Sequence, residues 1–102
     1  MQQPYSIEKI KYLRRFVGLR YREIGEMVGY SANTLTSMIY QIGSGRYNAV
    51  RGKRMRLLLT YIINEYIIEK FGEDEFRRIL KATDHHFEMK ERERKNDENQ
   101  AV

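Results

Sequence analysis

Five small or polar side chains between residues 32 and 40 could hydrogen-bond to the edges of nucleic-acid bases. On a helix they would share the outward side: Ala32, Asn33, Thr36, Ser37 and Tyr40. None of them is acidic, so this side would not repel a phosphate backbone. The amide of Asn33 can pair with adenine through two hydrogen bonds, which makes it the first candidate for a base contact in a major groove.

A continuous basic region follows these residues. No Asp or Glu occurs between Glu26 and Glu65, and this gap contains five cationic residues, namely Arg46, Arg51, Lys53, Arg54 and Arg56. The whole chain carries a net charge of +5, but residues 1–82 hold 15 Lys or Arg against 8 Asp or Glu, whereas residues 83–102 hold 4 against 6. Such a distribution favours a polyanionic partner and predicts that the cluster from Arg51 to Arg56, which includes Lys53 and Arg54, contacts phosphates.

Two short helices joined by a tight turn must position the outward side. Ile24 and Val28 are four residues apart, and the apolar residues of the second helix repeat at the same helical spacing: Leu35, Met38 and Ile39. Gly29 suits a left-handed turn, and Ser31 can cap the second helix. Gly25 predicts a close approach on the inner side of the first helix, and Tyr30 is expected to tuck under the turn. The same pattern also occurs in proteins that never bind DNA.

Residues 21–40 resemble the helix-turn-helix of the phage-repressor family, the Cro and cI type. Gly25, Gly29 and Leu35 fall at that family's small, glycine and branched-apolar positions, whereas Tyr21 replaces its usual Gln. The resemblance implies a five-helix, repressor-like, all-α bundle with a helix-turn-helix at residues 21–41. It implies phosphate contacts at the start of the first motif helix, at the cap of the second and in the loop that follows, by Arg20, Tyr21, Arg22, Ser31, Ser44, Arg46 and Tyr47.

The most apolar stretch runs from Leu57 to Phe71 and predicts a long fourth helix, capped by Asn48 or beginning near Lys53. One side is expected to close the core through Met55, Leu59, Ile62 and Tyr66. A narrow polar stripe is expected at Thr60, Asn64, Glu65 and Glu69. The remaining apolar residues predict a two-fold homodimer interface of Leu58, Tyr61, Ile68 and Phe71. The alternative is a helix that is fully buried within one chain.

The ends of the chain complete the predicted organisation. Met1 to Tyr5 is expected to be a loose arm, and Ser6 can cap a helix that runs to about Val17, with Gly18 ending it. Gly72 should end the fourth helix, and Asp74 can cap a short fifth one. Residues 1–82 then form the DNA-binding and dimerisation domain, and residues 83–102 form a charged tail that is frayed or partly disordered.

Enzymatic chemistry has little support in this sequence. His85 and His86 are adjacent and would point apart on a helix, no Cys is present, and no phosphate-binding glycine loop or nucleophile motif occurs. We therefore expect no catalytic residue, no metal site and no cofactor. No apolar run approaches the ~20 residues of a membrane span, so a soluble cytoplasmic protein is expected.

The expected function is sequence-specific binding of double-stranded DNA by a homodimeric transcriptional regulator, most simply a repressor. Two alternatives stay open. The chain could be a small helical interaction module that docks on a kinase or polymerase subunit, or a DNA-binding factor of replication or partition.

Overall fold

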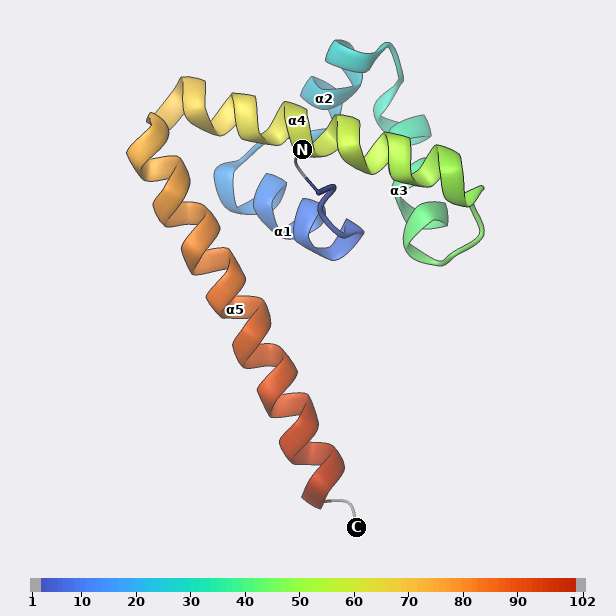
Figure 1. Ribbon diagram of the computed structural model, residues 1–102. Coiled ribbons are helices and arrows are strands. Elements are labelled where there is room, and N and C mark those ends of the chain that lie inside the picture. The colour runs from blue at the N-terminus through green and yellow to red at the C-terminus, as the bar shows by residue number, and fades with distance from the viewer. Residues whose placement is uncertain (1–2, 101–102) are drawn as a thin grey trace.

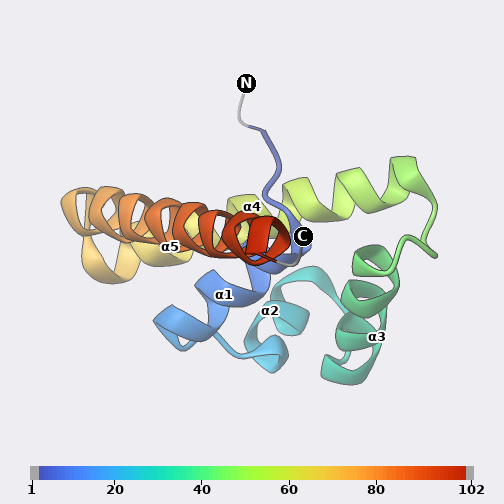
Figure 2. The ribbon, with the colours of Figure 1, turned by 90° about the horizontal axis from the view of Figure 1, so that it is seen from below.

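The computed structural model describes residues 3–100, with side chains to residue 96, as five α-helices and no strand. They are α1 (Ile7–Val17), α2 (Tyr21–Val28), α3 (Ala32–Gly43), α4 (Ala49–Phe71) and α5 (Glu73–Gln100). Helices α1 to α3 lie together on one side of α4, while α5 turns sharply after α4 and runs away from the body (Figures 1 and 2). The prediction of an all-α chain with five helices and a long fourth helix is confirmed.

Local signals set most of the helix ends. The hydroxyl of Ser6 accepts a hydrogen bond from the Lys9 amide at 3.2 Å, and the Asn48 side chain accepts from the amides at the start of α4 at 3.0 and 3.1 Å. Gly18 and Gly29 end α1 and α2 with φ of 73° and 83°, where a side chain would be strained. The caps and stops predicted at these four residues are therefore confirmed, and α4 begins at Ala49 rather than at Lys53. The cap predicted at Asp74 is wrong, because Asp74 lies inside the first turn of α5.

The core fills the space between α1, the α2–α3 pair and α4. Every helix supplies apolar side chains to it, and the fully buried ones include Ile10, Leu13, Ile24, Leu35 and Ile39 from the first three helices. From α4 the core takes Leu59, Ile63 and Ile67; Met55 and Tyr66 pack against it from the side. Ile62 is only partly buried, so the expected core side of α4 was rotated from the true one.

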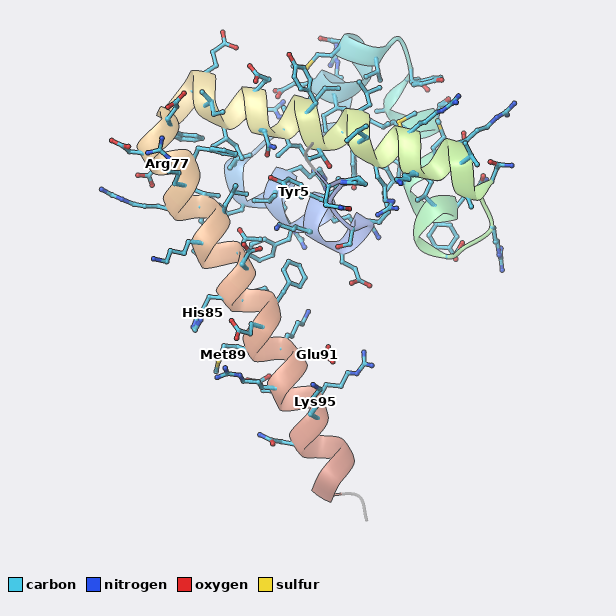
Figure 3. The ribbon with its side chains drawn as sticks, in the orientation of Figure 1. Tyr5, Arg77, His85, Met89, Glu91 and Lys95 are labelled. Atoms are coloured by element: carbon cyan, nitrogen blue, oxygen red, sulfur yellow. The ribbon has the colours of Figure 1, made fainter. Side chains whose placement is uncertain are left out.

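The polar stripe expected on α4 is wrong at two of its four positions. Thr60 and Asn64 are buried, because both hold the N-terminal arm: the Tyr5 amide donates to Thr60 Oγ1 at 2.9 Å, and the Tyr5 hydroxyl donates to Asn64 Oδ1 at 2.8 Å. Tyr5 itself is buried, so the arm is docked at this residue rather than loose (Figure 3). Residues 1 and 2 lie outside the described range. Buried polar groups need such partners, which explains the pairing.

The expected short fifth helix is also corrected, and residues 101 and 102 of the predicted tail lie outside the described range. One helix begins at Glu73 and continues through residue 100, with Asp74 in its first turn and no break between residues 82 and 83. Thr83 is buried, Asp84 forms an ion pair with Lys9 at 2.7 Å, and His86 stacks on Tyr12 with ring centroids 4.6 Å apart. These contacts with α1 hold the helix past the expected boundary. α5 then continues in the direction that leads away from the body, and His85 and Met89 lie on its outer side (Figure 3).

Candidate nucleic-acid interface

The turn between α2 and α3 packs closely against Gly25 of α2. The carbonyl of Gly25 accepts hydrogen bonds from the amides of Gly29 at 2.8 Å and Tyr30 at 2.9 Å. A Cβ on Gly25 would overlap the carbonyl oxygen of Tyr30. The close approach predicted at Gly25 is therefore real, but the approaching group is the backbone of the turn rather than the next helix.

The cap of α3 fixes where that helix begins. Ser31 Oγ accepts from the Thr34 amide at 3.1 Å and donates to Thr34 Oγ1 at 2.9 Å. The predicted cap is confirmed. Because the Ser31 hydroxyl hydrogen is already used within the cap, the phosphate contact expected of Ser31 would have to come from its backbone N–H, since a phosphate oxygen needs a donor.

The outer side of α3 is exposed, uncharged and polar. Asn33, Thr36, Ser37 and Tyr40 are all exposed, and Ala32 is half-buried at the first turn. Thr36 Oγ1 donates to the carbonyl of Ala32 at 2.7 Å, so its oxygen remains available as an acceptor. The opposite side carries the buried residues Leu35 and Ile39, which lock the orientation of this face. The five predicted base-contact residues thus lie on one side of one helix.

A groove of about 650 Å³ lies between the start of α1, the end of α3 and the start of α4. It brings together five of the predicted contact residues, namely Tyr40, Ser44, Tyr47, Lys53 and Arg56. One cation that we did not predict as a contact also lines it, Lys11; Glu8 is the one acid among its lining residues.

The two remaining predicted cations of α4 line a second, smaller groove. Arg51 and Arg54 line it, together with Tyr47 and four apolar or aromatic residues, Tyr30, Met38, Met55 and Leu58. Tyr30 is 42% exposed and does not tuck under the turn as expected. Tyr47 borders both grooves, so Lys53 and Arg56 line one groove beside it and Arg51 and Arg54 line the other.

The cations at the start of α2 form a third group. Arg20 is exposed at the residue before α2 and makes no side-chain cap, and Arg22 faces Glu26 at 3.6 Å with both side chains exposed. The Tyr21 ring is half-buried beneath the guanidinium of Arg14, whose Cζ lies 3.7 Å from the ring centroid. Arg46 is exposed in the loop and lines neither groove.

The predicted dimer residues are mostly accessible on α4. Leu58, Tyr61 and Phe71 are exposed, whereas Ile68 is half-buried. Leu57, which was not predicted for this surface, is exposed beside them. Within residues 3–96 the sequence therefore placed three of four residues on the open side of α4 and missed one.

The histidines form no metal site with other ligands. Among the described residues no group of three His, Cys, Asp or Glu side chains could hold a metal ion. His86 instead stacks on Tyr12 and meets Phe87 edge-on, at 5.3 Å between ring centroids. Its contact is with α1, and the adjacent His85 points away from the body (Figure 3). Across the same residues no helix combines the length and apolar character that a membrane crossing needs.

Comparison of the chain with family models, curated proteins and solved structures finds no match. The resemblance of residues 21–40 to the phage-repressor motif therefore stays a prediction from the sequence.

Proposed function

We propose that this protein is a sequence-specific, double-stranded DNA-binding transcriptional regulator that acts as a homodimer, with α3 in the major groove. The observation that carries the proposal is the outer side of α3, which is exposed, free of acids and rich in short hydrogen-bonding groups. Asn33 is the residue best suited to read a base, since its amide can both donate to and accept from adenine. Repression by occupying a promoter is the simplest role.

The charged side chains around α3 supply the sequence-independent part of the affinity. Lys53 lines the groove that Tyr40 also borders, and Lys11 and Arg56 extend its positive charge. Arg46 on the loop and Arg20 before α2 add exposed cations at either end of the helix pair. Each phosphate that these cations neutralise releases counterions, so the affinity should fall steeply with salt.

The repressor-like arrangement of two such units is part of this proposal. In that family a dimer binds two half-sites about one helical turn, ~34 Å, apart along the DNA. A palindromic site with this spacing is therefore expected, provided that the two α3 helices of the dimer present the same side to the DNA.

A selection from random duplexes tests the proposal directly. Anisotropy binding to a labelled random pool is repeated at several salt concentrations, and the bound DNA is recovered and sequenced. The expected result is an enriched palindrome and a linear fall of log affinity with log salt. Binding without an enriched sequence would favour a replication or architectural role, and no binding at low salt would overturn the proposal and favour the interaction module.

A further inference from the structure

The exposed side of α4 carries an apolar strip in the middle of the helix. Leu57 is 45% exposed, Leu58 41% and Tyr61 61%, and the three lie within little more than one helical turn. Large apolar side chains gathered in this way on a small chain mark a contact surface more often than a solvated one.

Opposite charges border this strip at its two ends. Arg51 and Arg54 lie on the amino-terminal half of α4, and Glu65 and Glu69 lie on the carboxy-terminal half; all four are exposed. Within residues 3–96 none of the four forms an ion pair. Arg51, Leu58 and Glu65 are seven residues apart in sequence, so they occupy the same position of a heptad along one edge of the strip.

We infer that two copies of this chain pair through α4 in an antiparallel orientation, with a two-fold axis near Leu58. In an antiparallel pair, one edge of α4 lies beside the same edge of the second copy, but the two run in opposite directions. Arg51 and Glu65 are equally far from Leu58, so Arg51 of one chain lies against Glu65 of the second copy. Arg54 then faces the half of the second copy that carries Glu65 and Glu69. A parallel pairing would instead set the cationic half of one helix beside the cationic half of the other, and like charges disfavour it.

This pairing rests on the proposed function in that it specifies which surface forms the proposed homodimer. It is argued from α4 alone, so it can be measured without DNA. It also reassigns two cations, because Arg51 and Arg54 would be occupied at the contact between copies. The phosphate contacts then fall to the other cations around α3, chiefly Lys53 and Arg46. An unrelated protein partner has no reason to match the reversed order of charges on this one helix, whereas a second copy matches it by symmetry.

Charge reversal on each half separately tests the orientation. One double variant is Arg51→Glu with Arg54→Glu, and the other is Glu65→Arg with Glu69→Arg. Sedimentation equilibrium without DNA should give a dimer for the unchanged chain. Each variant alone should dimerise at least about tenfold more weakly at low salt, because opposed pairs become like charges. An equimolar mixture of the two variants should recover a one-to-one heterodimer.

Two controls separate a lost contact from a lost fold. Arg15→Glu with Lys81→Glu lowers the net charge as much as Arg51→Glu with Arg54→Glu does, but at exposed positions away from α4. This control should leave the dimer intact. Tyr61→Arg alters an exposed side chain that the core does not use, and it should weaken the dimer while the helical circular-dichroism signal is kept.

Two results would overturn the antiparallel pairing: an unchanged chain that stays monomeric at high micromolar concentration, or a variant mixture that does not associate. A persistent monomer would also remove the homodimer from the proposed function, but neither result bears on whether α3 of a single chain reads a DNA sequence. A dimer that obeys the mixing test but enriches no DNA sequence would overturn the proposed function alone.

Discussion

Replacing Gly25 by Ala would test whether the turn between α2 and α3 is held by backbone contact. Gly25 lies inside α2, where an Ala would ordinarily be favoured by ~1 kcal/mol of helix propensity. Here the added methyl group would overlap the carbonyl oxygen of Tyr30 and lie 3.3 Å from its carbonyl carbon. That carbonyl belongs to a turn that the Gly25 carbonyl already binds through two amides. The methyl group therefore cannot be accommodated by a side-chain rotation.

The magnitude follows from two opposing terms. Overpacking against a fixed group costs ~1–3 kcal/mol, and sometimes more. The gain in helix propensity offsets ~1 kcal/mol of this. Because the overlapped group is backbone, the overpacking cost should fall in the upper part of that range, at ~2–3 kcal/mol, which leaves a net loss of about 1–2 kcal/mol in the free energy of unfolding. Each kcal/mol should lower the Tm by roughly 4–8 °C in a chain of this size. The turn must also move, so the outer side of α3 would tilt relative to α2.

Urea denaturation followed by circular dichroism measures the loss, and Gly52→Ala provides a matched control. Gly52 also lies inside a helix and is also buried, but a Cβ there would meet only side-chain atoms, those of Ile42 and Tyr47, at ordinary distances of 3.6–3.8 Å. The control should gain ~0.5–1 kcal/mol from propensity. If Gly25→Ala were as stable as the unchanged chain, or gained what the control gains, the backbone-contact argument would be refuted.

Four further substitutions address the base contact, a phosphate contact, the arm and the docking of α5. Asn33→Ala should cost ~1–3 kcal/mol at one base pair and relax specificity there, whereas Arg46→Ala should weaken all sequences alike and flatten the salt slope; equal losses on cognate and random DNA for Asn33→Ala would defeat its role. Tyr5→Phe should lower the unfolding free energy by ~1–3 kcal/mol, because it leaves the buried Asn64 amide oxygen without its donor; thermal melts that coincide with those of the unchanged chain would contradict this. Tyr12→Ala removes the stacking contacts with α5, so amide exchange in α5 should quicken while that of α4 stays slow; unchanged protection in α5 would show that other contacts hold it.

The helix ends were predictable because the signals that set them are local. Ser6, Ser31 and Asn48 each bind amides two or three residues ahead, and Gly18 and Gly72 each leave the right-handed region where a helix stops. Such contacts join residues that are close in sequence, so the local order of residues is enough to predict them.

The rotation of α4 was not predictable, because a distant residue decides it. Thr60 and Asn64 read as solvent-facing on a helical projection, yet Tyr5, more than fifty residues earlier, supplies the donors that make their burial favourable. Hydrophobic periodicity takes account of apolar residues only. It cannot show that two polar side chains are buried because another segment supplies their hydrogen-bond donors.

The fifth helix was half predictable. Its first turn is acidic and Arg77 pairs with Glu73 and Asp74 at the spacing that stabilises a helix, which the sequence already displays. The low apolar content after Asp84 argued against a packed element. What that pattern could not show is that Tyr12 of α1 reaches across to stack on His86.

For the candidate interface, the sequence placed the outer side of α3 but not the way the surrounding cations divide. The five predicted residues lie together because a single helix carries them. The separation of Lys53 from Arg51 and Arg54 depends on where Tyr47 lies, and Tyr47 is positioned by the loop between α3 and α4. Side chains within one turn of a helix can therefore serve different surfaces.

The carboxy-terminal half of α5 gives the chain a rigid spacer of defined length. Past Phe87, the last residue with a ring contact to α1, the helix continues to Gln100, and at 1.5 Å per residue this part extends ~20 Å (Figure 1). A fluorophore or fusion partner joined after it would start at a set direction and distance from the body instead of sampling the space around a flexible linker. Dyes at different positions along this helix would then report the orientation of the body as well as its distance from the dye. This makes α5 a suitable place to label the molecule.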